Sequence, residues 1–584
     1  MAGKLGALTI AAPGFFGLNT QDSGITISNG FALEATNCII DKFGRIGSRK
    51  GWTTYSNTDA GVTGAVRAIK EHTETDGTLT VLFAANNKLW KLDGSNNPVE
   101  LSTLSATITA ATQANPCSIT ATAHGFNTGD TVTITGVVGM TELNDNSYTI
   151  TVVDADTFTL DSTDSTAFTT YTSGGTATRD EITVTDDDWQ IVSYNNKSLF
   201  IQAGHTMVYY DGTSDSYLEL ANPPSATQPT CGASCFNRAW VAKDYTVYWS
   251  KILEPHTFTG TGSGFINMRE IFGEDDKVVA ITSYNNRLVI FGRRNIAFFA
   301  GAEDPTGTSF QLTDHIKGIG CIARDSVQNV GTDVVFLSSE GVRSVGRVIQ
   351  EQSSPIGDVS KNVRDELVTY ADSESQYRIK AVYSPLDAFY LLTMPTTGRT
   401  YCFDMRTKLE DGSRRVTIWD SIDPKSFAVL NDNTLLIGQT AYVGKYDTNL
   451  DNTETYRMVY YTNYLDLGNS VTESILKKVR LAILGSGQQT GLLKWAFDYN
   501  DVYRNTVFTL ADAGSSEYNV DEYFSDDDVD NEAEYSSGLI LGNLSLHTGG
   551  RGAVLQLGVE IEINGGPISV QKMDIFAKQG KLIS

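Results

Sequence analysis

The chain has 584 residues, of which 40% are hydrophobic and 10% aromatic, which is enough apolar surface for about two to four domains. Its formal charge of −25 should repel nucleic acid and anionic membranes, although an acidic surface also suits the solubility of a large secreted or virion protein. No stretch approaches the roughly 18 apolar residues of a membrane span, and Met1–Ile10 lacks the pattern of a signal peptide. We therefore expect a protein that is made in the cytoplasm and does not span a membrane.

Residues 1–52 are irregular and rich in glycine, with poor alternation of apolar and polar positions. Such a segment is a weak candidate for a sheet of its own. We predict an extended N-terminal arm that packs on other elements.

Short strands joined by tight turns begin near Ala65. The tetrapeptide Ser-Tyr-Asn-Asn occurs at Ser193–Asn196 and again at Ser283–Asn286, each time between two apolar runs, and Asn86-Asn87 stands in a similar setting. Asparagine tolerates the left-handed backbone of two-residue hairpins, so the pattern predicts repeated hairpins. Repeated hairpins of this length favour a β-propeller, which we place at residues 53–104 and 179–450.

Residues 105–178 differ from the rest of the chain in composition, because they are rich in threonine and contain no lysine or arginine. Their short alternating strands predict a complete small β-domain. Without these residues, the pairs Asn86-Asn87 and Asn195-Asn196 would be separated by a distance in sequence that is typical of one propeller blade. We therefore interpret the segment as a domain inserted into a blade loop, where insertions are tolerated.

Longer strands follow after about Asp451, ending with the two runs Val554–Ile563 and Ile568–Ile575 around a Gly-Gly turn. This pattern is typical of a β-sandwich. The predicted fold class is all-β: a β-propeller with an inserted small β-domain and, at residues 451–584, a C-terminal platform-like sandwich. The best helical candidate is a short one around Val359–Tyr370.

The sequence contains only weak signals for catalysis, cofactor binding or metal binding. The common nucleotide-binding, zinc-protease and hydrolase motifs are absent, so we predict no enzyme activity, catalytic residue, cofactor or metal site. The spacing of Asp526, Asp528 and Asp530 imitates the start of a calcium loop, but Asn531 and Ser537 occupy positions that such a loop reserves for glycine and glutamate, which favours a solvated acidic loop. The six cysteines, of which only Cys231 and Cys235 are close in sequence, are expected to be free thiols.

The two histidines with the most distinctive settings are His124, in an Ala-His-Gly-Phe turn, and His256, in a Glu-Pro-His-Thr-Phe segment. We interpret His124 as a turn or surface residue and His256 as a loop residue.

Several segments resemble the tail nozzle family of short-tailed phages, also called tail tubular protein B or tail hub. In the propeller region the resemblance rests on Tyr245–Ser250, Glu254–Phe258, Glu274–Ile281, Leu288–Phe291 and Ala297–Gly301. In the arm it rests on Gly17-Leu18-Asn19, Asn37 and the run from Gly44 to Arg49-Lys50-Gly51. The inserted domain resembles a β-module common in phage structural proteins, through Ala123–Phe126, Gly129-Asp130, Val153–Phe158 and Ser173–Thr176.

The resemblance implies a virion protein that forms a hexameric ring below the portal and its adaptor, contacts the adaptor and tail fibres, and guides double-stranded DNA without specific binding. The residues that it marks fall into two groups. The assembly residues of the arm are Gly17, Asn19, Asn37, Arg49 and Gly51. The residues of the propeller phrase are Ser250, Pro255, Phe258, Asp275 and Gly301.

Two other functions remain open from the sequence: a tail propeller that binds a host receptor or glycan, and a propeller glycosidase or lyase. A fibre protein usually has a shaft with trimeric repeats, and an enzyme should show convergent polar residues. Neither feature is evident in the sequence.

Overall fold

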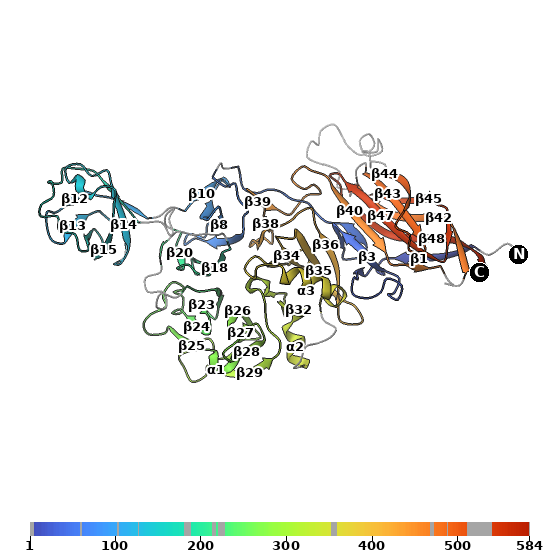
Figure 1. The fold of residues 1–584 in the computed structure, drawn as a ribbon, viewed down its shortest axis with the longest axis horizontal. Helices are drawn as coiled ribbons and strands as arrows, with labels where there is room; N and C mark the ends of the chain where they lie inside the picture. Colours follow the sequence, from blue (N-terminus) through green and yellow to red (C-terminus); the bar gives the residue numbers. More distant parts are fainter. Residues whose placement is uncertain are drawn as a thin grey trace, which may run out of the picture. The chain divides into compact units, whose positions relative to one another are not determined.

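The computed structural model describes residues 5–58, 61–101, 104–126, 128–179, 188–212, 218–219, 228–351, 359–467, 472–486, 489–510 and 540–582 (Figure 1). The chain divides into two compact units. Unit 1 holds residues 1–57, 291–297 and 314–584, and unit 2 holds residues 58–290 and 298–313. Helices in the described part are short. They are η1 (Thr141–Leu143), α1 (Arg269–Phe272), η3 (Arg324–Ser326), α2 (Val345–Glu351), η4 (Lys361–Val363) and α3 (Arg364–Asp372).

Four consecutive antiparallel sheets have the up-and-down strand order of propeller blades, starting in unit 2. The first contains β7 (Ala68–Thr73), β8 (Leu79–Ala85), β9 (Lys88–Leu92) and β10 (Pro98–Glu100). The second contains β18 (Gln190–Tyr194), β19 (Lys197–Ile201), β20 (Val208–Tyr210) and β21 (Leu218–Glu219). The third contains β22 (Cys231–Cys235), β23 (Arg238–Lys243), β24 (Thr246–Trp249) and β25 (Gly264–Asn267). The fourth contains β26 (Val278–Tyr284), β27 (Arg287–Gly292), β28 (Asn295–Ala300) and β29 (Gln311–Lys317), with residues 291–297 and 314–317 in unit 1.

Three further groups of strands lie in unit 1. A three-stranded sheet contains β30 (Gln328–Asn329), β31 (Val334–Ser338) and β32 (Gly341–Ser344). A four-stranded sheet contains β37 (Ser426–Val429), β38 (Leu435–Gly438), β39 (Val443–Lys445) and, from the N-terminal arm, β6 (Thr53–Thr54). Between them, β33 (Lys380–Ser384), β34 (Phe389–Met394), β35 (Arg399–Lys408) and β36 (Arg414–Trp419) have the same meander but continue into a larger sheet.

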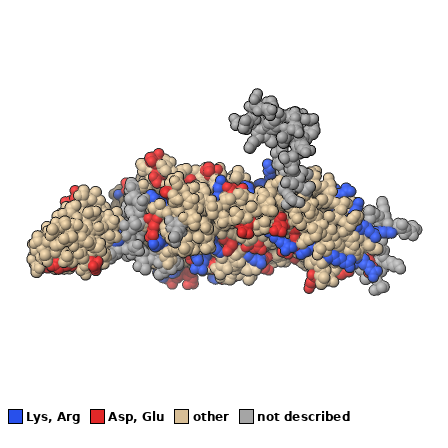
Figure 2. Space-filling view, turned by 90° about the horizontal axis from the view of Figure 1, so that it is seen from above, with Lys and Arg blue, Asp and Glu red and all other residues tan. Residues whose placement is uncertain are grey.

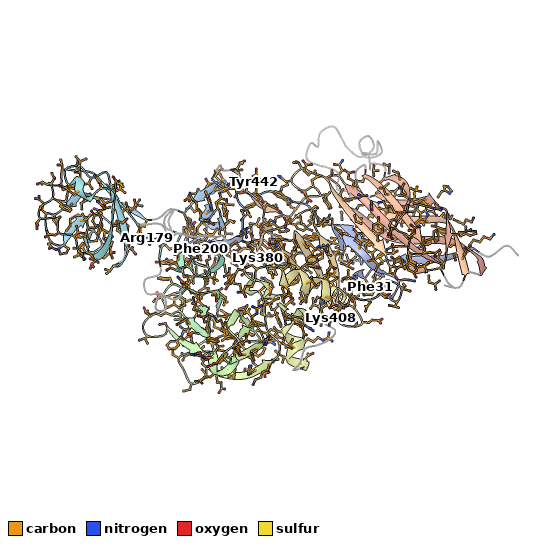
Figure 3. All side chains as sticks on the ribbon, in the orientation of Figure 1. Phe31, Arg179, Phe200, Lys380, Lys408 and Tyr442 are labelled. Atoms are coloured by element: carbon orange, nitrogen blue, oxygen red, sulfur yellow. The ribbon has the colours of Figure 1, made fainter. Side chains whose placement is uncertain are left out.

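The asparagine pairs turn the hairpins as predicted. Asn86 and Asn87 have φ of 57° and 59° between β8 and β9, and both Ser-Tyr-Asn-Asn copies place their asparagines at φ of 46° to 59° between two paired strands. Left-handed backbone at both central positions defines the tight hairpin that matches strand twist. The apolar runs on either side are buried, and Phe200 of β19, marked in Figure 3, has no exposed surface.

The segment predicted as an insertion forms a sheet of its own. In strand order it runs β11 (Ser105–Thr107), β17 (Thr176–Arg179), β14 (Thr131–Thr135), β15 (Asn146–Asp154), β16 (Thr157–Leu160), β13 (Cys117–Thr120) and β12 (Ala110–Ala111). Its buried side chains, including Ile119, Val132 and Phe158, make a separate hydrophobic core. On the face seen in Figure 2 it shows acidic side chains but no basic ones.

Excision of residues 105–178 is expected to leave the rest of the protein folded. The two ends of the segment meet, because Ser105 pairs with Thr178 and the Arg179 amide donates to the Leu104 carbonyl at 2.8 Å. A short Asn-Gly link from Leu104 to Arg179 should therefore replace the segment without strain. Calorimetry of the shortened chain should lose the transition of the inserted domain and keep the others within about 2 °C. Failure to fold would mean that the segment belongs to the core of unit 2.

A β-sandwich fills the remainder of unit 1. Its first sheet contains β1 (Leu5–Ala11), β4 (Cys38–Ile40), β5 (Ile46–Ser48), β42 (Thr472–Gly485), β45 (Ile540–His547), β46 (Arg551–Gly552) and β48 (Ile568–Leu582). Its second sheet joins β33–β36 to β2 (Gly17–Leu18), β3 (Phe31–Thr36), β40 (Tyr456–Thr462), β41 (Leu465–Asp466), β43 (Gln489–Phe497), β44 (Arg504–Leu510) and β47 (Val554–Ile563). Buried residues of both sheets, such as Val479, Val559 and Ile575, form one core between them.

The predicted fold class is therefore confirmed: the protein is all-β, with propeller blades, an inserted small β-domain and a C-terminal sandwich. Two details differ from the prediction. The arm is more regular than expected, because β1, β4 and β5 join one sandwich sheet and β2 and β3 join the other. The predicted helix is confined to α3 and the 3₁₀ turn before it.

Candidate assembly sites

Arg49 is the centre of a buried cluster that joins the arm to the rest of unit 1. Its guanidinium makes two hydrogen bonds to the Asp451 carboxylate, at 2.8 and 2.6 Å, and a third to Ser421 Oγ at 2.6 Å. It also lies over the ring of Tyr456, 4.0 Å from the ring centroid. Its side chain has no exposed surface. A planar, bidentate pair of this kind is well suited to arginine, and lysine could not reproduce it.

Asn37 adds a second link in the same cluster. It has φ of 51°, and its side-chain amide donates to Asp420 Oδ1 at 2.7 Å and to the Arg457 carbonyl at 3.1 Å. Its side-chain oxygen accepts from Arg49 Nε at 3.3 Å and from the Asp420 amide at 3.2 Å. Because both ends of the amide are used and the backbone is left-handed, asparagine meets both needs of this position.

The two glycines of the arm stand where another backbone approaches closely. A Cβ on Gly51 would lie 1.9 Å from the Leu450 carbonyl oxygen, and a Cβ on Gly17 would lie 2.5 Å from the Val416 carbonyl oxygen. Asn19, which is 2% exposed, accepts from the amides of Gln21 and Asp22 and so forms an Asx turn. All five arm residues marked by the family resemblance thus make contacts within the chain.

The propeller phrase builds a corner beside the third blade, in unit 2. Ser250 is fully buried, and its hydroxyl accepts from the Ala239 amide at 3.0 Å and donates to the Lys251 carbonyl at 2.9 Å. Pro255 is buried, and Phe258 packs in a small core with residues of β19 and β23. Arg238 reinforces the corner by donating to the Ser250 and Gly262 carbonyls, both at 2.7 Å. Sequence reasoning missed Arg238, whose only signal was an arginine within an apolar strand.

The last two residues of the phrase behave differently from each other. Gly301 has φ of 72°, and a Cβ there would lie 2.2 Å from the Ser309 carbonyl oxygen, so glycine is needed to close the loop after β28. Asp275 is exposed in the segment that follows α1. Four of the five phrase residues are therefore buried or sterically constrained, and Asp275 is the one that faces solvent.

The histidines take structural positions. His124 is 2% exposed and stacks on Phe126, with 5.2 Å between ring centroids, so it lies in the core of the inserted domain. The prediction that it is a turn or surface residue was therefore wrong about its exposure. The Phe126 amide donates to its Nδ1, and this bond holds the ring in place. His256 is half-buried and packs on Tyr209 in the loop after Ser250. Burial lowers the pKa of His256, which favours its neutral form.

A hydroxyl and imidazole pair lies between the first two blades. His72 Nδ1 is 2.8 Å from Ser198 Oγ, which is 2.7 Å from Ser193 Oγ. A serine beside a histidine can act as a nucleophile, but His72 is 1% exposed and Ser198 has no exposed surface, so a substrate could not reach them. Burial lowers the pKa of His72, consistent with a neutral ring packed against Tyr210.

The buried thiols also lack the signs of a reactive centre. All six cysteines are free, and burial raises the pKa of Cys235 to about 12 and that of Cys321 to about 11, so both are protonated and poor nucleophiles. Within the described residues, no group of three or more His, Cys, Asp or Glu side chains is arranged to hold a metal ion. The acidic run 526–534 lies outside those residues. No helix in the described part of the chain is long and apolar enough to cross a membrane.

Residues 165–426 match the family model described as "Bacteriophage P22 Gp10, beta-propeller". The match runs from the end of the inserted domain to the start of β37 and includes all of the propeller phrase. Residues 117–180 match a second model, "Ubiquitin-activating enzyme E1 FCCH domain", which coincides with most of the inserted domain.

The similarity of the chain to individual known proteins is low. No curated protein matches the chain. Among solved structures, BamB from Moraxella catarrhalis is 10% identical with a TM-score of 0.30, over 65% of this chain and 82% of that chain. The extracellular domain of the putative one component system BT4673 from B. thetaiotaomicron is 7% identical with a TM-score of 0.25, over 72% of this chain and 40% of that chain.

Proposed function

We propose that the protein is a structural component of a phage tail, and that it forms the nozzle or hub ring through which the genome leaves. The observation that carries the proposal is the match of residues 165–426 to a phage propeller family. The arrangement of unit 1 supports it, because Arg49 binds Asp451 and lies over Tyr456 of β40, and β6 pairs with β39, so the arm is an ordered part of unit 1.

The charge of the chain fits a passage for DNA. Affinity for DNA grows with the number of phosphates that a protein neutralises, so an acidic wall would let a duplex slide without adhering. The chain carries 69 acidic and 44 basic residues, and a hexameric ring would multiply the excess. We propose that part of this acidic surface faces the channel, while an adaptor attached to the portal holds the ring in place.

The geometry gives less support to an enzyme or a glycan receptor. The one serine and histidine pair described is closed to solvent, and burial keeps the thiols of Cys235 and Cys321 protonated. The phrase residues hold a loop in place by backbone contacts instead of presenting a set of polar groups to a ligand. These features suit a protein whose surfaces meet other proteins.

Electron microscopy tests the proposal directly. The purified protein should form rings with six-fold symmetry in negative stain at high concentration or with its adaptor, and antibody-gold against it should label the tip of virion tails. A protein that stays monomeric under every condition, or labelling confined to the capsid, would contradict the nozzle assignment.

A further inference from the structure

The outer face of the first sandwich sheet is basic. Along β42, the side chains of Leu476, Val479, Leu481 and Ile483 enter the core, which turns those of Lys478 and Arg480 outward. On β48 the same alternation buries Met573 and Ile575 and places Asp574, between them, on the opposite face together with Lys572, Phe576 and Lys578. The outward cations, called here the basic face, are Lys477, Lys478, Arg480, Lys572 and Lys578.

The strand register brings these residues together. Lys478 pairs with Phe576, Arg480 with Asp574, and Ala482 with Lys572 across β42 and β48. The Lys478 ammonium lies 4.7 Å and the Arg480 guanidinium 5.9 Å from the centre of the Phe576 ring. The half-buried ring therefore holds two neighbouring cations in place by cation–π attraction. In Figure 2, basic side chains gather over the end of unit 1 that carries β42 and β48 in Figure 1.

One carboxylate lies within the face and is already engaged. Asp574 accepts from Thr9 Oγ1 at 2.6 Å and pairs with Lys572 Nζ at 2.9 Å. Glu473, at the beginning of β42, is directed to Arg551. The described residues of β45 in the same sheet contribute no acidic side chain. The face therefore carries more positive than negative charge. Like charges side by side on a sheet repel one another, and an anionic partner would reduce this repulsion.

We propose that the basic face is a docking surface for a carboxylate-rich surface of a partner protein. The basis is charge complementarity: apart from the Glu473–Arg551 pair, the described side chains of this sheet face include five cations and one carboxylate, in a chain whose formal charge is −25. The proposal goes beyond the proposed function and does not depend on it, because the face would have the same chemistry in any assembly.

The details of the face favour a protein over a nucleic acid. A DNA duplex carries one charge per about 1.7 Å along its whole length, so the long-range field of a chain with charge −25 opposes it more strongly than it opposes a short acidic segment of a partner protein. The Phe576 ring is occupied by Lys478 and Arg480 and is not free to stack on a base. Asp574, in the middle of the face, would meet a phosphate with repulsion but can accept from the hydroxyl and amide groups of a protein.

A fluorescein-labelled oligoglutamate peptide tests the proposal with the full-length chain. The peptide should bind with an affinity that falls as salt rises, and Lys478→Gln/Arg480→Gln should weaken it about tenfold, since each lost ion pair is worth roughly 0.7 kcal/mol. The control is Lys42→Gln/Lys408→Gln, which makes the same charge change at two exposed positions of unit 1 outside the basic face; Lys408, at the end of β35, is marked in Figure 3. This control should bind like the unchanged protein.

Two outcomes would overturn the proposal. If both double variants lose the same affinity, binding follows total charge and the face is not a site. If labelled duplex DNA binds more tightly than the peptide and loses affinity only in Lys478→Gln/Arg480→Gln, the face is a nucleic-acid surface. Circular dichroism should be identical in all variants, because the substituted side chains are not part of a core and glutamine is polar and keeps their first two methylene groups.

Discussion

Arg49→Met is expected to lower the stability of unit 1 by about 3–5 kcal/mol, because it leaves the Asp451 carboxylate buried without its partner. Asp451 is 10% exposed, so water can compensate only part of the lost hydrogen bonds. Calorimetry should show the transition of unit 1 shifted down by roughly 5–10 °C.

The matched control for Arg49 is its neighbour Lys50, whose pair with Asp387 is longer, at 3.4 Å, and partly exposed. Lys50→Met should cost no more than about 1 kcal/mol. Combining Arg49→Met with Asp451→Leu should recover much of the loss, because the uncompensated charge is gone. A small effect of Arg49→Met alone, equal to that of Lys50→Met, would show that the arm is not anchored through this cluster.

Gly51→Ala should lower the stability of unit 1 by an amount similar to that of Arg49→Met. The new methyl group would lie 1.9 Å from the Leu450 carbonyl oxygen and 2.3 Å from its carbon, both backbone atoms that cannot move as a side chain can. We expect a loss of about 3 kcal/mol or more, at the upper end of what overpacking produces, and a large fall in the yield of folded protein.

Gly549→Ala is the control in the same unit, because a Cβ there would meet nothing within 4 Å. Its effect should stay within about 0.5 kcal/mol. Equal midpoints for the two alanine variants in calorimetry would mean that the approach of Leu450 to Gly51 relaxes at little cost.

The fold class could be predicted from the sequence because its signals are local. An Asn-Asn pair between two apolar runs specifies its own hairpin, and a change from mixed charge to a threonine-rich segment without basic residues marks the inserted domain. Those features depend on neighbours a few residues away, so no tertiary information is needed to recognise them.

The partners of the arm could not be predicted in the same way. Arg49 and Asp451 are about 400 residues apart, and the short strands β2 and β5 pair with the distant strands β36 and β48. Such segments carry no periodic pattern, since their conformation is set by tertiary contacts. For the same reason the burial of His124 could not be seen: the aromatic neighbour Phe158 reaches it through sheet pairing.

The pairing of β1 with β48, which joins Leu5 to Lys578, has a consequence for biosynthesis. The ribosome makes β1 long before β48, so β1 must wait without its partner while more than 500 residues are added. The blades and the inserted domain use contacts nearer in sequence and can fold first. A polypeptide interrupted before β48 could not complete the sandwich, and it would therefore lack the basic face. Assembly through that face would select for chains in which β48 has been made and has paired.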